Sequence, residues 1–529
     1  YHELVLRRPR SDSGIFGSLG GGFCRRRIEA SIRGGGLAHH RHPGLHSGCS
    51  PSPAWEENQN GCPVDGSLGN RHGHEPDDGL RVGLLARLGF KDLQWSYSSL
   101  SMGLLEISGF YKNYFMKLKV LALSLLLSSP LVSFKLFSET PWLDKDYVEK
   151  RMKGMTPVQG DGPSQWRVIW TEEPSTRATI SWTTAKKGSV HKVRYGIRST
   201  GIAELSTSQS QEAQRSDAYS SAKGEYYHHA RISGLKPSTT YDFEIESDGK
   251  KSPVMHFTTA PADDREFRLL FGGDSRTGIV SRGQVNLLMA DLSEKDDQLI
   301  AFAHGGDYIV SGKSWSQWST WLSQHELTVA KSGKVLPIIP TRGNHDGGPL
   351  YDEIFDTPGG AGKNYFHTMI SPKVALVTLN SEISAGGEQQ AWLAKTLFDL
   401  RPKVRWLLAE YHRPVWPAVK GPGKAKNFWV PLFEKFNLDL AVESDGHVIK
   451  RTVPIRNEKK DPPGIVYVGE GGLGVPQPKP KSDRWYLQKP GMTGAGHHVM
   501  RVTFGKTKMD YEVVLLDRNR ADKHQFSPR

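Results

Sequence analysis

The chain has 529 residues and a formal net charge of +13, with charged and hydrophobic shares of 24% and 37% that are ordinary for a soluble globular protein of about three domains. The positive charge is spread thinly, which favours attraction to phosphate-bearing substrates and argues against a dedicated nucleic-acid surface. Cys24, Cys49 and Cys62 are the only cysteines, so the remainder of the chain has neither a disulfide framework nor a thiolate metal site.

Residues 1–115 do not resemble a domain. They are rich in Gly, Arg, His and Ser and show no sustained hydrophobic period, as in Gly34-Gly35-Gly36 and His39-His40-Arg41-His42. We expect this segment to be disordered, or to be upstream sequence translated by mistake. A short regulatory tail is the alternative.

Residues 116–138 have the pattern of a secretory signal peptide. A basic head, Met116-Lys117-Leu118-Lys119, is followed by an uncharged apolar run over 120–127 and then by small residues. The run is too short for a comfortable membrane span. We therefore expect a secreted or periplasmic (extracytoplasmic) protein, with an uncleaved N-terminal anchor as the alternative. No other stretch is expected to cross a membrane.

Residues 160–260 alternate between apolar and polar positions in short runs, which predicts an all-β sandwich. The segment 235–241, Leu-Lys-Pro-Ser-Thr-Thr-Tyr, resembles the tyrosine corner of fibronectin type III domains, and 258–261 is interpreted as the exit linker. The predicted strands are 167–170, 178–182, 191–195, 229–232 and 241–245.

Residues 265–515 change to an alternation of strand, loop and helix. Apolar runs without clean alternation predict strands that are buried on both faces, with helices such as 284–292 and 388–400 between them. This pattern is typical of an α/β sandwich with its chemistry outside the strand ends. The predicted strands are 267–271, 299–303, 335–339, 374–379, 405–408 and 438–442.

A polar loop follows each of five of these strands, and every one of the loops offers Asp, Asn or His. Oxygen and imidazole ligands without sulfur suit Fe, Mn, Zn or Mg. Each loop alone would be an ordinary turn or helix cap, but five in succession indicate a shared metal site. The loops are 272–276 (Gly-Gly-Asp-Ser-Arg), 304–308 (His-Gly-Gly-Asp-Tyr), 343–346 (Gly-Asn-His-Asp), 410–414 (Glu-Tyr-His-Arg-Pro) and 443–447 (Glu-Ser-Asp-Gly-His).

The order of these motifs resembles that of the calcineurin-like metallophosphoesterase superfamily, and the β domain in front resembles the arrangement of purple acid phosphatases. The resemblance implies a four-layer α/β/β/α sandwich over 265–515, preceded by a fibronectin III-like domain over 160–260. It also implies a centre of two divalent or trivalent metal ions.

Site roles follow from the same resemblance. It implies that Asp307 bridges both ions, that Asp274 ligates the first ion and that Asn344 and His412 ligate the second. His345 with Asp346 would then serve the leaving group or the transition-state oxygens.

The sequence departs from the family pattern at two single positions and in its last motif. Val310 stands where purple acid phosphatases have a ligating Tyr, since Tyr308 comes two residues too early. Arg276 stands where many relatives have a metal-binding His; it cannot ligate a metal but can grip phosphate, so we expect it, with His345, to contact substrate.

The last motif allows two alignments. In the one we prefer, Asp445 takes the place of the first His and His447 that of the second, so that Asp445 ligates the second metal and His447 the first. In the other, His447 takes the first place and Ile449 leaves a gap.

The expected function is hydrolysis of phosphate monoesters by a metal-activated hydroxide, as in an acid phosphatase. A phosphodiesterase of the same superfamily and a secreted binding protein with a decayed metal site are the alternatives. The expected partner is a phosphate ester, without a dedicated nucleic acid and without a membrane beyond the signal anchor. The oligomeric state is left open.

Overall fold

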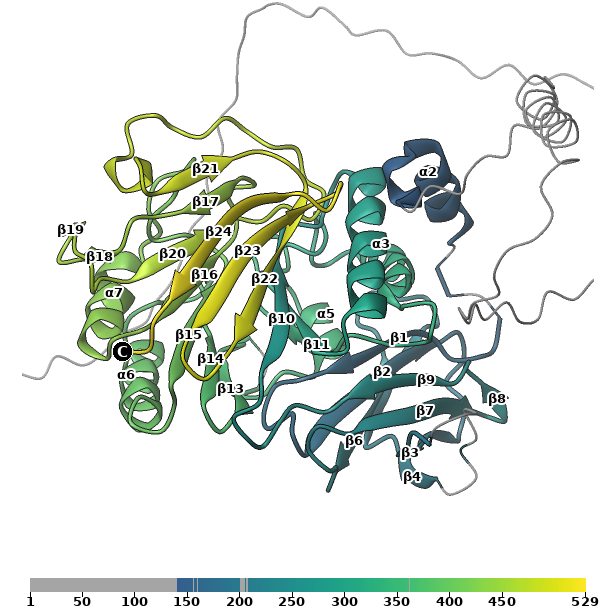
Figure 1. Ribbon diagram of the computed structural model, residues 1–529. Coiled ribbons are helices and arrows are strands. Elements are labelled where there is room, and N and C mark those ends of the chain that lie inside the picture. Colours follow the sequence, from purple (N-terminus) through teal and green to yellow (C-terminus); the bar gives the residue numbers. More distant parts are fainter. Residues whose placement is uncertain (1–139, 156, 159, 200–204, 206–207, 361) are drawn as a thin grey trace, which may run out of the picture. The chain divides into compact units, whose positions relative to one another are not determined.

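The computed structural model describes residues 140–529 apart from 156, 159, 200–204, 206–207 and 361 (Figure 1). The predicted segments 1–115 and 116–138 lie outside the described residues. None of the helices in the described part is long and apolar enough to cross a membrane.

The described chain begins with a short helical element that the sequence pattern did not predict. The 3-10 helix η1 (Pro141–Leu143) leads into α2 (Lys145–Gly154), where the Asp144 side chain accepts hydrogen bonds from two N–H groups of the first turn. The two buried residues of α2, Val148 and Met152, pack against α3 (Ile279–Lys295). Two apolar positions are too few to give a readable helical period.

An all-β sandwich follows, as predicted. Its strands alternate between buried and exposed positions, and the Tyr241 hydroxyl accepts a hydrogen bond from the Lys236 N–H (2.8 Å). One sheet has the order β1-β2-β6-β5, and the other contains β4, β3, β7, β8 and β9. The strands are β1 (Ser164–Ile169), β2 (Arg177–Thr184), β3 (His191–Ile197), β4 (Gln209–Glu212), β5 (Arg215–Ala218), β6 (Tyr226–Ser233), β7 (Thr240–Ser247), β8 (Lys250–Lys251) and β9 (Met255–Thr258).

The sandwich and the region after it share a sheet. Strand β1 pairs in parallel with β12 (Ile338–Pro340), with Ile169 opposite Ile338, and the Trp170 N–H donates to the Ile338 carbonyl (3.0 Å). The result is a ten-stranded sheet of order β24-β23-β22-β10-β11-β12-β1-β2-β6-β5. The regions 160–260 and 265–515, expected as separate units, are therefore joined by main-chain hydrogen bonds as well as by the linker.

A second sheet of seven strands has the order β13-β14-β15-β16-β20-β17-β21, in which β14, β15, β16 and β20 are parallel. In the first sheet β10, β11 and β12 are parallel, and β22 continues it antiparallel to β10. The bounds are β10 (Phe267–Gly272), β11 (Leu299–His304), β13 (Phe366–Ser371), β14 (Val374–Thr378), β15 (Trp406–Tyr411), β16 (Leu440–Glu443), β17 (Ile449–Arg451), β20 (Val466–Gly469), β21 (Met492–Gly494), β22 (His498–Phe504), β23 (Met509–Leu515) and β24 (Arg520–Phe526); β18 (Ile455–Arg456) and β19 (Lys459–Lys460) form a small hairpin.

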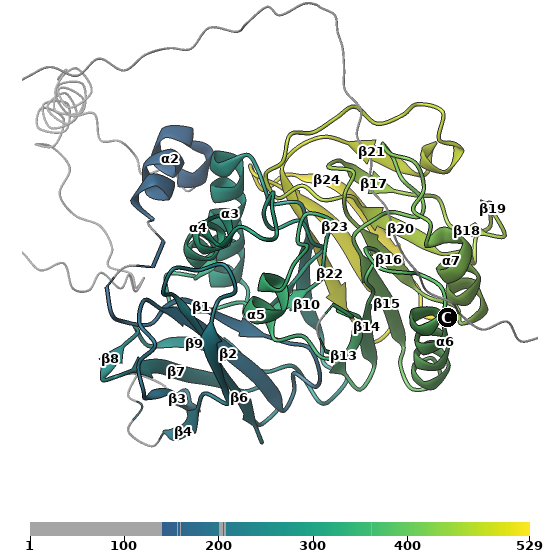
Figure 2. The same cartoon turned by 180° about the vertical axis from the view of Figure 1, so that it is seen from behind.

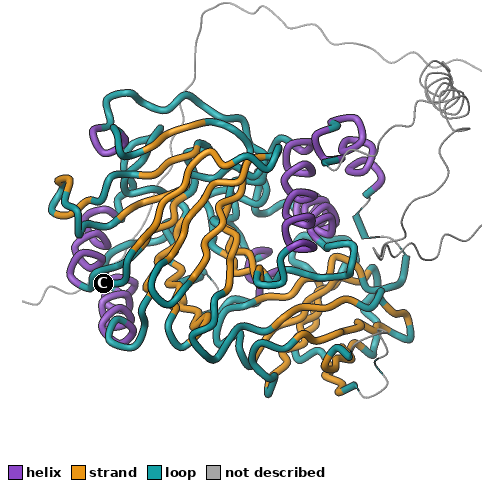
Figure 3. Tube along the Cα trace, in the orientation of Figure 1, coloured by secondary structure: helices purple, strands orange, loops and turns teal. Residues whose placement is uncertain are grey.

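Alternate residues of the central strands enter different cores, which confirms the four-layer fold. Leu269 of β10 and Leu408 of β15 belong to the core between the sheets, whereas Leu270 packs in a second core with α3 and Leu407 in a third with the helices of the other side. Figures 1, 2 and 3 show α3 and the α6–α7 pair on opposite sides of the strands. The remaining helices are α4 (Trp315–His325), α5 (Leu350–Phe355), α6 (Glu388–Leu400) and α7 (Lys426–Lys435), with the short 3-10 helices η2 (Glu326–Thr328) and η3 (Trp485–Leu487).

The third predicted strand, 335–339, is shorter and later than expected. Only 338–340 form β12, because the Val335 N–H donates to the His256 carbonyl (2.8 Å) and Lys334 bridges to the same residue. The apolar run thus pairs with two partners, His256 near the start of β9 and the first sheet.

Candidate metal centre

The polar loops predicted from the sequence meet where strands of both sheets end. Asp274 follows β10, Asp307 follows β11 and Asn344 follows β12, while His412 follows β15 and the loop 443–447 follows β16. Since these strands are parallel within their sheets, their carboxyl ends lie at one edge. The three residues Asp274, Asp307 and His412 are buried and offer ligand atoms that lie within 4.8 Å of one another.

Four of the predicted ligand residues have left-handed backbone conformations. The φ angles are 62° at Asp274, 59° at Asp307, 68° at Asp445 and 64° at His447. Non-glycine residues adopt this region at a cost and tend to do so at functional sites. The loops are therefore held in conformations that turn these side chains toward one another against local preference.

His412 is at the centre of one group of ligand atoms. Its Nδ1 donates to the Gly305 carbonyl (2.8 Å), which orients the ring so that Nε2 is directed at the group. Nε2 lies 3.2 Å from Asn344 Oδ1, 3.3 Å from Asp307 Oδ1 and 3.6 Å from Asp445 Oδ1. Oxygen ligands gathered around an imidazole nitrogen in this way could hold a cation.

A different arrangement lies on the other side of Asp307. Arg276 Nε donates to Asp307 Oδ2 (3.1 Å), and its Nη2 donates to His447 Nε2 (3.3 Å). Asp274 Oδ1 lies 3.2 Å from the same His447 nitrogen, and Asp274 Oδ2 accepts the Asp445 N–H (2.9 Å). A guanidinium therefore contacts two of the three residues expected to hold the first metal ion.

No phenolate is available to that side from the tyrosine two positions before Val310. The Tyr308 ring is fully buried, stacks on His304 with ring centroids 3.8 Å apart and has its hydroxyl 3.4 Å from the His304 carbonyl. Trp315, Trp318 and Trp321 are likewise buried in the core beside it.

The last loop places Asp445 and His447 at the site, whereas Ile449 is buried in β17 opposite Gly494. Behind the loop, the fully buried Lys450 forms ion pairs with Glu443 and Glu470, 3.0 Å from the latter. The His447 N–H donates to the Glu470 carbonyl (2.5 Å). Glu470 is far along the chain from the five loops, so nothing in the sequence pattern marked it.

His345 and Asp346 differ in position although they are neighbours. His345 is partly exposed; its Nδ1 donates to the Val310 carbonyl (2.6 Å), and its Nε2 lies 4.0 Å from Asp307 Oδ2.

The expectation that Asp346 contacts the reacting group needs correction. Its carboxylate is fully buried and accepts backbone N–H groups of Asp307, Tyr308 and Gly343 (2.8, 3.0 and 2.8 Å), so it fixes the loops. Burial and the Asp307 charge raise the pKa of Asp346 to about 7.

The two carboxylates nearest His412 are in their ionised form at neutral pH. Burial alone would raise the pKa of Asp307, but His412 and the His345 N–H hold it below its ordinary value. For Asp445, burial is likewise outweighed by His412 and Lys420, and the pKa is lowered. Ionised carboxylates are the form that binds metal.

A cavity of about 700 Å³ opens beside Asp445. Lys420 lines it and places its Nζ 2.5 Å from Asp445 Oδ1; Arg413 and Lys424 add positive charge. Ile383 and the half-exposed Phe428 give it an apolar wall. The sequence pattern did not single out Lys420 or this cavity.

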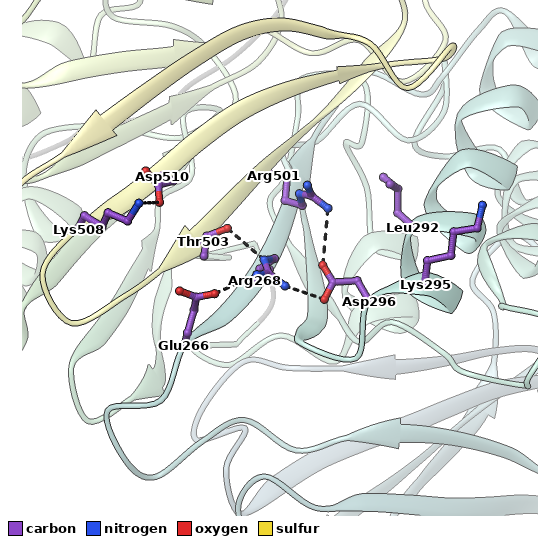
Figure 4. A pocket seen from close by; sticks show the side chains of 9 residues that line it. All are labelled: Glu266, Arg268, Leu292, Lys295, Asp296, Arg501, Thr503, Lys508 and Asp510. Atoms are coloured by element: carbon purple, nitrogen blue, oxygen red, sulfur yellow. Dashed lines mark hydrogen bonds and ion pairs between the residues drawn. The ribbon is translucent and has the colours of Figure 1, made fainter. Parts of the chain in front are cut away.

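Another cavity, of about 610 Å³, lies at the opposite end of β10 (Figure 4). Most of its charges are paired: Arg268 contacts Glu266 and Asp296, and Arg501 contacts Asp296. It is remote from the strand ends that carry the ligand group.

Both domains match families of known proteins. Residues 163–259 match the family model "Purple acid Phosphatase, N-terminal domain", and residues 267–449 match "Calcineurin-like phosphoesterase". An uncharacterized protein of Mycobacterium tuberculosis is 22% identical over 355 residues, 59% of this chain and 65% of that protein. Purple acid phosphatase 15 of Arabidopsis thaliana is 23% identical over 290 residues, 46% of this chain and 53% of that protein. The matches thus span less than two thirds of these relatives' own lengths.

The structure of purple acid phosphatase PPD1 from yellow lupin (Lupinus luteus) seeds shares the fold, with a TM-score of 0.58 at 16% identity over 69% of this chain and 74% of that one. Both domains are thus matched, in the order that the sequence pattern indicated. Residues 267–449 of the chain thus match the calcineurin-like phosphoesterase family, and residues 163–259 in front of them match the N-terminal domain of purple acid phosphatases.

Proposed function

We propose that the protein hydrolyses phosphate monoesters in a metal-dependent reaction. The observation that carries the proposal is the buried cluster of Asp274, Asp307 and His412, whose ligand atoms lie within 4.8 Å of one another, with oxygens of Asn344 and Asp445 at 3.2 and 3.6 Å from His412 Nε2. Carboxylate, amide and imidazole ligands gathered in this way suit a divalent cation. A divalent ion held there would polarise a phosphoryl oxygen and lower the pKa of a bound water.

The other residues at the site have roles that their positions support. Arg276 and Lys420 provide positive charge for the non-bridging oxygens of a phosphate group. The Nδ1–H of His345 is held by the Val310 carbonyl, so its Nε2 is left to carry the proton that the departing alkoxide needs. Asp346 fixes the loops and so positions Asp307 and His345.

Phosphodiester hydrolysis is a second candidate, and the cavity beside Asp445 favours it. Its volume of about 700 Å³ has room for a second ester group. Its cationic and apolar walls suit an ester group that has both a negatively charged part and an apolar part. Comparing kcat/KM for para-nitrophenyl phosphate and its bis ester decides between the two substrate classes.

We extend the proposal to an extracytoplasmic location, which rests on the signal peptide pattern at 116–138 and is tested by cell fractionation.

Removing metal from the purified protein should abolish hydrolysis of para-nitrophenyl phosphate. Dialysis against a chelator is followed by metal analysis and assay, and then by addition of Mn²⁺, Zn²⁺, Mg²⁺ or iron. Activity should return with at least one of these ions. Full activity in a protein shown to be free of metal would refute the proposal.

Asp307→Asn should reduce metal content and turnover more than Asp274→Asn. One Asp307 oxygen belongs to the His412 group and the other holds Arg276, whereas Asp274 lies on the Arg276 side. The loss for Asp307→Asn should be at least about 10 to 100-fold. The substitutions are matched in shape, so equal effects would contradict a special role for Asp307.

His345→Ala should leave metal content unchanged and lower kcat by roughly 100-fold or more, because it removes a proton donor but no ligand. His367→Ala, an exposed histidine of β13, is the matched control. A variant that also loses its metal would make His345 a ligand.

Asp445→Ala should empty the ligand group, because Asp445 Oδ1 is one of its acceptors. Metal content and turnover should both fall, by at least about 10 to 100-fold in affinity. Asp483→Ala, at a side chain that is 74% exposed, is the control. If Asp445→Ala matches the parent protein in both measurements, the alignment with Ile449 at the last position is the correct one.

A further inference from the structure

We propose that the guanidinium of Arg276 takes the place of the first metal ion, so that the chain binds a single divalent ion in the group formed by Asp307, Asn344, His412 and Asp445. This inference deepens the proposed function, since it concerns the same site. It departs from the two-metal centre that the family resemblance implies.

The imidazole of His447 provides the first reason. Arg276 is always a donor, so at 3.3 Å its Nη2 donates to His447 Nε2, which must then accept. A neutral imidazole nitrogen has one lone pair. While it accepts from Arg276, His447 Nε2 cannot ligate a metal ion.

The oxygens on this side give the second reason. Asp307 Oδ2, the oxygen directed away from His412 Nε2, accepts from Arg276 Nε (3.1 Å). The arginine is 15% exposed on a buried carboxylate, so the contact is largely shielded from water. Val310 supplies a carbonyl to His345 and no ligand to this position. The set of ligands for a first metal ion is therefore incomplete, and one of its members, Asp307 Oδ2, is already hydrogen-bonded to Arg276.

The group around His412 is the reverse case. Here oxygens of Asn344, Asp307 and Asp445 face His412 Nε2, whose ring is oriented by the hydrogen bond from Nδ1 to the Gly305 carbonyl, so a cation that replaces the Nε2 proton finds three oxygens around it. Asp274 Oδ1 accepts no hydrogen bond although it is buried. Since Asp274, Asp307 and His412 offer ligand atoms within 4.8 Å of one another, a carboxylate oxygen of Asp274 is near enough to face the same single ion.

The charges agree with one ion. Asp274, Asp307 and Asp445 together with Arg276 and Lys420 leave one net negative charge. One divalent ion changes this to one net positive charge, which suits a phosphate dianion. A second would raise it to three in a buried site, against a fixed guanidinium.

The test is the metal stoichiometry of the full chain, measured by mass spectrometry after equilibration with Mn²⁺ and gel filtration, with Mn²⁺ electron paramagnetic resonance as a second readout. The parent protein should hold about one Mn²⁺ per chain and show the signal of an isolated ion. Arg276→His supplies an imidazole at the position where relatives have one. This variant should hold about two ions per chain with a spin-coupled signal.

Two further variants serve as controls. Arg276→Lys keeps the charge without a ligand atom and should stay at about one ion per chain. The double variant Arg276→His/His447→Ala should return to about one, because it removes a ligand of the restored position only.

Two Mn²⁺ ions in the parent protein would overturn the inference, whatever the variants do, so a variant that fails to fold does not prevent the test. An Arg276→His protein that folds as the parent by circular dichroism and still holds one ion would also contradict it. A parent protein with two ions that hydrolyses phosphate esters refutes the inference and leaves the proposed function intact. A parent protein that holds one ion but does not hydrolyse phosphate esters supports the inference and refutes the proposed function.

Discussion

Asp307 is the residue on which the two halves of the site depend. Its Oδ1 lies 3.3 Å from His412 Nε2 and accepts the His345 N–H, while its Oδ2 accepts from Arg276. One buried carboxylate therefore connects the first sheet, which positions Asp307 after β11, to the second sheet, which positions His412 after β15. A charge in this place is tolerated only because donors and a cation site surround it.

The residues around the site restrict the movement of its charged side chains. The Asp346 carboxylate accepts hydrogen bonds from three backbone N–H groups, and Lys450 is fully buried between Glu443 and Glu470. These contacts stabilise loops whose ligand residues have left-handed φ angles. The strain is local, and the buried ion pairs and backbone hydrogen bonds compensate for it.

The sequence predicted those features that depend on the local pattern of residues. Continuous apolar runs predicted strands that are buried on both faces, and Asp, Asn and His after the strand ends predicted the ligand loops. Contacts between distant segments were not predictable: the pairing of Ile169 with Ile338, the position of Lys420 on Asp445 and the Glu470 ion pair depend on tertiary structure. Asp346 was misread because a carboxylate that serves a substrate and one that serves backbone N–H groups look the same in a motif. Roles carried over from the family also could not show that Arg276 reaches His447.

The shared sheet gives the N-terminal domain a part in the site. Asn344 lies in the loop that leaves β12, and β12 is short, with β11 on one side and β1 on the other. Without β1, this three-residue strand would be an exposed edge, and its carboxyl end would be held by one neighbour. Because Asn344 Oδ1 must stay 3.2 Å from His412 Nε2 on the other sheet, the position of the loop matters to the ligand group. The β sandwich therefore acts as a structural support for the metal centre, which follows from the sheet order and not from any residue that the sandwich places there.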